Sequence, residues 1–129
     1  RGFLQYQCAL PPDAAEPALR EILGHIAASG QGSFLAVLKR FGDRPAPGLL
    51  SFPRPGATLA LDFPFSAQAT LPLLKTLDAV VAQAGGALYP AKDARMDAAM
   101  FRRSCPRLEQ FLPFVDPRFS SGFWRRVID

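Results

Sequence analysis

Along the chain, residues 3–10 alternate between apolar and polar positions, a second stretch at 33–41 is largely apolar on both faces, residues 57–63 alternate again, and a short apolar run follows at 87–89. A period of two is typical of β-strands that bury one face, so we expect four strands. In the second stretch Lys39 shares a face with apolar residues. That lysine therefore either extends to solvent or faces an anionic ligand.

Between these stretches, apolar residues recur every three and four positions, which predicts two α-helices. The first follows Asp13-x-x-Glu16, a spacing that resembles a capping box, and it stops at Gly30. The second covers residues 66–84 and is closed by two glycines. The elements then follow one another in the order β-α-β-β-α-β.

This order predicts an α+β fold of the ferredoxin-like, split βαβ type, in which both helices cover one face of an antiparallel four-stranded sheet. Residues 42–56 are rich in proline and glycine and are expected to form a loop. Short helical patterns follow at 97–104 and 106–114, and Trp124 is expected to serve in packing. We therefore expect a single domain, residues 1–129.

Alternation also divides the predicted sheet into two faces. The apolar set is expected to face the helices: Leu4, Tyr6, Phe34, Leu38, Leu59 and Leu61. The opposite face then carries hydrogen-bonding or small side chains and one cation: Gln5, Gln7, Val37, Lys39, Thr58 and Ala60. Asp62 alternates with the same set. Such a face meets water in a free-standing domain, or it forms one wall of a ligand pocket.

Composition narrows the class of protein. The chain has 129 residues, of which 49% are hydrophobic and 20% charged, a balance typical of globular domains. No apolar run approaches the roughly 20 residues of a membrane-spanning helix, and no signal peptide is recognisable. The two cysteines are expected to be reduced core residues, which favours a cytoplasmic location. The chain has a single histidine and therefore few of the side chains that usually bind zinc, so we expect no metal site.

Charge and aromatic placement argue against nucleic acid as a partner. The net charge is +4, but the basic residues are dispersed along the chain. RNA-binding sheets of this shape carry exposed aromatic side chains on their central strands, whereas the polar face predicted here carries Gln, Lys and Thr.

Residues 86–95 combine a strand end with Tyr89, Lys92, Asp93 and Arg95. Loops that follow strand ends often carry binding groups, although a solvated turn has the same composition. The chain also starts at an arginine and enters a strand directly, as if it were part of a longer protein.

Several motifs resemble the C-terminal part of FAD-linked oxidases of the vanillyl-alcohol-oxidase superfamily, and within it decaprenylphosphoryl-ribose oxidases. They occur in order over nearly the whole chain: LQYQ at 4–7, FLAVLKRFG at 34–42, LSFP at 50–53, DFP at 62–64, GGxLYxAKDxR at 85–95, DP at 116–117 and WRR at 124–126. No single motif is diagnostic, but the ordered combination is fairly specific.

This resemblance implies a flavoenzyme in which an N-terminal domain holds FAD and this chain forms a substrate domain over the flavin. Lys92 resembles the lysine near the flavin pyrimidine edge, with a catalytic role, and Tyr89 resembles the tyrosine that helps hold the ring. Gln5, Gln7 and Lys39 resemble substrate-pocket residues. The intact enzyme is then expected to oxidise an alcohol by hydride transfer to FAD, and the chain alone to be inactive.

The resemblance is incomplete along one pocket wall. Thr58 and Ala60 stand where the related oxidases carry Asn and Cys, and Ala57 stands where they carry Trp. These smaller side chains favour a sugar, polyol or lactone as the substrate over a polyprenyl-phosphate sugar. Two alternatives remain open: a stand-alone ferredoxin-like module that binds a ligand or protein without catalysis, and a domain that oligomerises through its open face.

Overall fold

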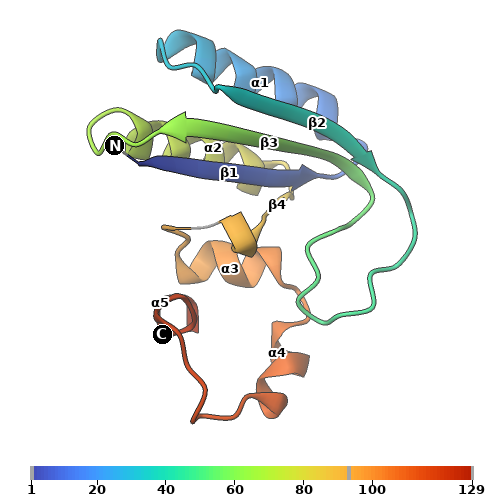
Figure 1. Cartoon of the computed structure of the whole chain (residues 1–129). Helices are drawn as coiled ribbons and strands as arrows, with labels where there is room; N and C mark the ends of the chain where they lie inside the picture. Colours follow the sequence, from blue (N-terminus) through green and yellow to red (C-terminus); the bar gives the residue numbers. More distant parts are fainter. Residues whose placement is uncertain (1, 93, 129) are drawn as a thin grey trace.

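The computed structural model describes residues 2–92 and 94–128 and contains a four-stranded antiparallel sheet (Figure 1). The strands are ordered β2-β3-β1-β4 across the sheet. Their bounds are Phe3–Leu10 for β1, Leu35–Phe41 for β2, Gly56–Pro64 for β3 and Ala87–Leu88 for β4. Helix α1 (Ala15–Ala28) joins β1 to β2, and α2 (Thr70–Gln83) joins β3 to β4. The predicted α+β fold and its β-α-β-β-α-β order are confirmed.

The strand register confirms the predicted division of the sheet into two faces. Residues directly opposite each other on antiparallel strands point to the same side of the sheet. Gln7 of β1 and Val37 of β2 both pair with Ala60, and Lys39 pairs with Thr58. These side chains therefore lie together on the face that we call the open face, while the intervening residues point to the helices.

The core lies between the helices and the other face of the sheet. Its buried side chains come from both layers and include Tyr6, Cys8, Leu61, Phe63, Ile22, Leu74, Leu77 and Val81. The apolar stripe of each helix and the apolar face of each strand meet in one cluster, so each layer covers the apolar side chains of the other. Among the described residues, no helix is long and apolar enough to cross a membrane.

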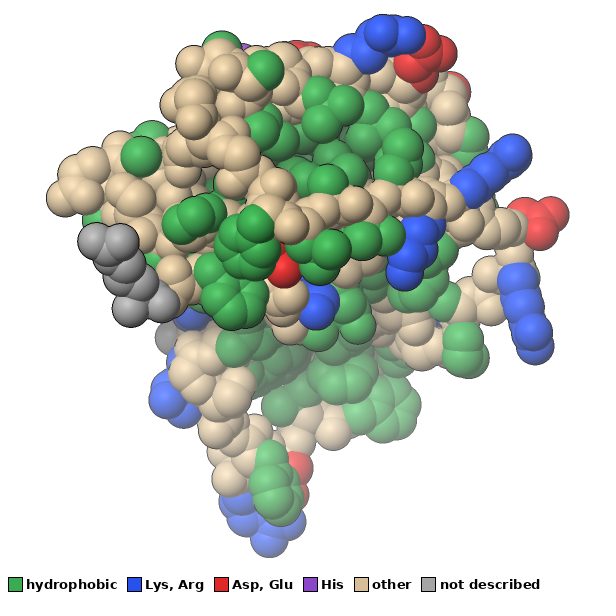
Figure 2. All heavy atoms as spheres, turned by 45° about the horizontal axis from the view of Figure 1, so that its top comes forward, with side chains coloured by type: hydrophobic (Ala, Val, Ile, Leu, Met, Phe, Trp, Pro, Cys, Tyr) green, Lys and Arg blue, Asp and Glu red, His purple; other side chains and the backbone are tan. Residues whose placement is uncertain are grey.

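Strand β2 extends beyond the helix layer, and here the expected burial is wrong. Phe34 is 64% exposed and Leu38 is 61% exposed. Leu38 does pair with the core residue Leu59, but β2 is an edge strand and nothing described covers its outer half. Figure 2 shows hydrophobic side chains gathered on the side of α1 and β2, where Leu23 and Leu35 are also exposed.

Both long helices begin later than their sequence patterns suggest. The N-cap of α1 is Ala14, without any side-chain capping bond, so the predicted Asp13–Glu16 capping box is wrong. The backbone of Ala14 instead donates to Pro11 in a turn that precedes the helix. Helix α2 begins at Thr70 because Ser66 accepts hydrogen bonds from the backbone of residues 69–71 in a preceding turn.

The C-terminal elements enlarge the core along the β4 edge. They are η1 (Pro90–Lys92), α3 (Ala98–Ser104), α4 (Leu108–Phe111), η2 (Leu112–Phe114) and α5 (Gly122–Ile128). Trp124 packs edge-on against Phe101 and Phe111, with ring centroids 6.2 and 6.0 Å away, so its predicted packing role is confirmed.

Residues 42–55 form the expected loop, and it contains no strand. Phe52 from this loop is buried against Ala9 and Ala87 on the open face. Arg54 donates to the carbonyl of Ser104 at 2.7 Å, which fastens the loop to α3. One end of the open face is therefore covered by the chain itself.

Gly56, at the start of β3, has a φ of +129°. A Cβ at this position would stand 1.9 Å from the carbonyl oxygen of Leu10. We expect Gly56→Ala to lower the free energy of unfolding by about 3 kcal/mol or more, because backbone strain and overpacking add. Gly30→Ala is the matched control: its φ is also positive, +67°, but a Cβ there meets nothing within 4 Å. Urea denaturation that shows equal losses for both variants contradicts this expectation.

Candidate functional site

The candidate site lies where β1 runs past the end of β4. Strand β4 pairs only with Cys8 and Ala9 of β1, so the first half of β1 has no strand on that side. Residues 89–92 and 94–96 take its place. The backbone N–H of Tyr89 donates to the carbonyl of Gln7 at 2.9 Å, and that of Lys92 donates to Tyr89 at 3.1 Å. The loop that carries Lys92 is thereby held against the edge of β1.

Two pairs of polar side chains meet on the open face. The Lys92 Nζ donates a hydrogen bond to Gln5 Oε1 at 3.1 Å, although the two residues are 87 positions apart in sequence. Gln7 Nε2 donates to Thr58 Oγ1, also at 3.1 Å. Lys92 and Gln7 are half-buried and Gln5 is exposed. The face therefore presents a fixed cation beside amides that can bind a ligand.

The remaining predicted site residues differ in how accessible they are. Val37 and Ala60 are half-buried, and Lys39 is exposed. Thr58 is only 1% exposed, because Phe52 and its neighbours cover that end of the face. Tyr89 is half-buried and stacks on Phe52, with ring centroids 4.5 Å apart. The structure thus brings the predicted residues to one face. Thr58 is buried there, so it acts on a ligand only through its hydrogen bond with Gln7.

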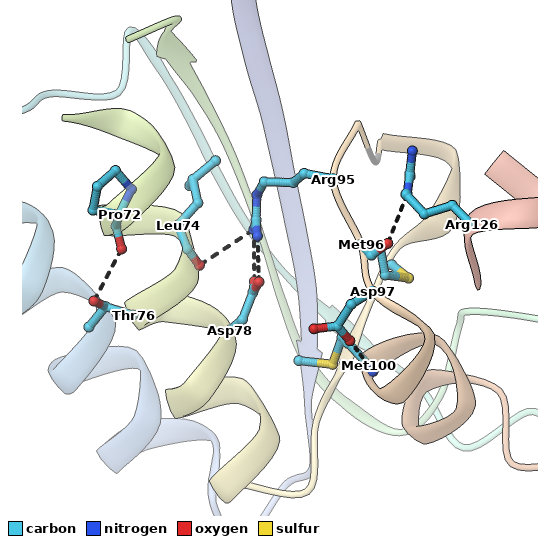
Figure 3. A network of polar contacts seen from close by, with 9 residues as sticks. All are labelled: Pro72, Leu74, Thr76, Asp78, Arg95, Met96, Asp97, Met100 and Arg126. Carbon is cyan, nitrogen blue, oxygen red and sulfur yellow. Dashed lines mark hydrogen bonds and ion pairs between the residues drawn. The ribbon is translucent and has the colours of Figure 1, made fainter. Parts of the chain in front are cut away.

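An ion pair between Arg95 and Asp78 anchors the loop to helix α2 (Figure 3). The pair is bidentate, with Arg95 Nη2 at 2.8 Å from Asp78 Oδ1, and the guanidinium also lies over the Tyr6 ring. Both charged side chains are largely shielded from solvent, so the pair is stronger than a surface ion pair. Arg95 therefore braces the loop, whereas Asp93 of the same run lies outside the described residues.

The two residues after Arg95 are held as well. The backbone carbonyl of Met96 accepts a hydrogen bond from Arg126 Nε at 2.9 Å, and the Met96 side chain is buried. Asp97 accepts a hydrogen bond from the N–H of Met100 at 2.8 Å and so caps helix α3 (Figure 3). Residues 95–97 are therefore attached in turn to α2, α5 and α3.

A cleft runs between β1 and this loop, lined by Gln5, Tyr6, Gln7, Tyr89, Lys92 and Arg95 among others. Its volume is about 20 Å³, far below the roughly 300 Å³ of a small-molecule pocket. A ligand on the open face therefore needs a second wall. Tyr6 is 4% exposed, and burial, with a smaller contribution from Cys8, raises the pKa of its hydroxyl. The nearby Asp78 carboxylate raises this pKa further, and the buried Tyr6 hydroxyl makes no hydrogen bond of good geometry with any described residue.

One residue of the open face was absent from the predicted site. Asp62 pairs with Gln5 on β1 and with Leu35 on β2, and it is 7% exposed. Its backbone N–H and carbonyl bond to Ser33 Oγ. Among the described residues, its carboxylate has neither a hydrogen bond nor an ion pair. The alternation of residues 57–63 had placed Asp62 on this face, but only the structure reveals its burial.

The cysteines are both free and buried, as predicted. Burial raises the pKa of Cys8 to about 12 and also raises that of Cys105. Neither thiol is therefore suited to act as a nucleophile at neutral pH. Within residues 2–92 and 94–128, no cluster of three or more potential metal ligands occurs.

Comparison with known proteins finds close sequence relatives. Over 132 residues the chain is 41% identical to the decaprenylphosphoryl-β-D-ribose oxidase of Mycolicibacterium smegmatis, an alignment that covers 98% of this chain and 28% of the oxidase. The predicted resemblance to decaprenylphosphoryl-ribose oxidase is confirmed. An uncharacterised protein from the mprA 5′ region of Streptomyces coelicolor is 36% identical over 131 residues, covering 98% of this chain and 35% of that protein.

The chain therefore spans about a third or less of the length of these relatives. No protein-family model matches it. Among solved structures, a prephenate dehydratase from Streptococcus mutans shares 14% identity, with a TM-score of 0.42, over 69% of this chain and 41% of that one. This last likeness is too weak to support a conclusion about fold or function.

We expect Asp78→Ala to lower the free energy of unfolding by about 1–3 kcal/mol, because it leaves the Arg95 guanidinium without its main carboxylate partner. The same change should speed hydrogen exchange of the amides of residues 89–96. Glu16→Ala is the control, since it removes the exposed Glu16–Arg20 pair and is expected to cost less than about 0.5 kcal/mol. Equal effects of the two variants in urea denaturation would argue against the anchoring role.

Stability is expected to fall at alkaline pH. The pKa of Cys8 rises from 9.0 to about 12 on folding, so above pH 9 the unfolded chain releases a proton that the folded chain keeps. The contribution of Cys8 to stability is therefore fully present below about pH 9 and declines by about 1.4 kcal/mol per pH unit between pH 9 and about 12. Urea denaturation at several pH values should show a smaller decline for Cys8→Ala, and an unchanged slope contradicts the assignment.

Proposed function

We propose that this chain is the C-terminal substrate-binding domain of an FAD-dependent oxidoreductase, which oxidises an alcohol group of a sugar, polyol or lactone by hydride transfer to flavin. The observation that carries the proposal is the Lys92–Gln5 contact at the edge of an open, polar sheet face. The sequence identity of 41% to a decaprenylphosphoryl-ribose oxidase also supports the proposal. FAD itself is bound mainly by a separate N-terminal domain that closes over this face.

The residues present fit the flavin role assigned to this face. Bound flavin supplies the hydride acceptor and gains negative charge near N1 and the C2 carbonyl on reduction. A cation held in place beforehand stabilises such charge without reorganisation. Lys92 meets this need, because its amine is tied to Gln5 and its backbone to Tyr89. Tyr89 has one ring face occupied by Phe52, so it contacts the flavin or substrate with its edge or hydroxyl.

The other predicted residues take substrate-binding roles according to their exposure. Gln5, Gln7 and Lys39 offer hydrogen bonds, while Val37 and Ala60 form the floor between them. Thr58 contributes by orienting the amide of Gln7. The small side chains of Val37, Thr58 and Ala60 leave room for a sugar or polyol ring or chain.

The alternative is a stand-alone ferredoxin-like module that binds a ligand or a protein without catalysis. The observation in its favour is the exposure of large apolar side chains on α1 and around β2, namely Leu23, Phe34 and Leu38. The two functions differ in a simple property of the full-length protein. A flavoenzyme is purified with the absorption spectrum of FAD or acquires it on adding FAD, whereas a binding module does not.

In the full-length protein we expect Lys92→Ala to slow the reduction of flavin by substrate about 100-fold to 1000-fold, the range seen when one electrostatic stabiliser is removed. The measurement is anaerobic stopped-flow absorbance with the flavin-bound enzyme. Lys75→Ala is the matched control, because Lys75 is an exposed lysine on α2. Flavin reduction at the wild-type rate in Lys92→Ala would exclude Lys92 from the mechanism.

A further inference from the structure

We propose that Asp62 binds a hydroxyl group of the ligand on the open face and thereby selects an uncharged, polyhydroxylated group at this end of the site. The inference deepens the proposed function and rests on it only for the flavin chemistry. Its starting point is Asp62, a residue that is 7% exposed and whose carboxylate reaches the open face without a side-chain partner among the described residues.

Burial without a partner is costly for a carboxylate. Aspartate is rarely buried unless it is paired, because removal of its charge from water is not repaid by a hydrogen bond or counter-ion. In Asp62 the backbone is fully engaged with Ser33, but the side chain is not. A side chain that destabilises the free protein in this way is typical of a residue kept for binding.

The neighbours of Asp62 define the chemistry of its ligand. Gln5 lies directly opposite on β1, and its Oε1 is already taken by Lys92. Its Nε2, for which no partner exists within the described residues, remains a donor. A hydroxyl group both donates and accepts, so it satisfies the carboxylate of Asp62 and the amide of Gln5 together. A phosphate or carboxylate of the ligand would be repelled by Asp62.

The charges on β3 and its neighbours also set an orientation. Lys39 pairs with Thr58, which is four residues from Asp62 along the strand, a separation of about 13 Å. The open face thus carries Lys39 towards one end and, at the other, the Asp62 carboxylate, with the Lys92 amine bound to its cross-strand neighbour Gln5. An uncharged polyol end of the ligand fits at Asp62, and any anionic group fits towards Lys39.

The test compares Asp62→Asn with the wild type in the full-length protein, using xylitol and D-ribose as uncharged probes and ribose 5-phosphate as an anionic probe. Without ligand, Asp62→Asn should raise the melting temperature by about 2–4 °C, since an unpaired buried charge is removed. The affinity for the uncharged probes, measured by titration calorimetry, should fall about 10-fold to 100-fold with the loss of a charged hydrogen bond. Asp43→Asn, in an exposed loop position, should change neither quantity.

Each other outcome overturns the inference. A lower melting temperature for Asp62→Asn means that the carboxylate supports the fold. Unchanged affinity means that it does not touch the ligand, and failure of both uncharged probes to bind the wild type means that the ligand class is wrong. Failure of the proposed function gives a different result. If the protein never takes up FAD but its affinity for polyols still depends on Asp62, this inference stands and the oxidoreductase function is excluded.

Discussion

The shortness of β4 is the constraint on which the candidate site depends. A strand edge needs hydrogen-bonding partners, and β4 supplies them only for Cys8 and Ala9 of β1. Residues 89–92 and 94–96 lie along the rest of this edge, beginning with the hydrogen bond from Tyr89 to Gln7. A longer β4 would occupy the place where Lys92 now reaches Gln5. The same irregularity that interrupts the sheet therefore positions its main cation.

A loop that carries the cation proposed to act on flavin must also be held in one conformation. Here Arg95, Met96 and Asp97 are attached in turn to α2, α5 and α3. Most of these contacts are charged or charge-assisted hydrogen bonds in partly shielded surroundings, where they are stronger than on the open surface. The amine of Lys92 consequently rests on a frame built from three helices, although the loop itself has little regular structure. Such preorganisation is what an electrostatic role requires.

The open face shows how stability and binding compete in this fold. At one end, Phe52 from the long loop covers Thr58 and stacks on Tyr89, so that part of the face behaves as a second small core. At the other end, the face keeps exposed Gln5 and the unpaired carboxylate of Asp62. A domain selected for stability alone would not retain that carboxylate. The uncovered end is the part of the face that the proposed ligand site uses.

The sequence alone determined the order of the elements and the division of the sheet into two faces, because alternation and helical periodicity are local properties of the chain. It also placed Gln5, Gln7 and Lys92 in the candidate site through their resemblance to a family. Only the tertiary structure decided which face residues are accessible: it buried Thr58, exposed Leu38 and left Asp62 without a partner. Those outcomes depend on which segment, distant in sequence, covers each strand. A local sequence pattern does not specify which segment that is.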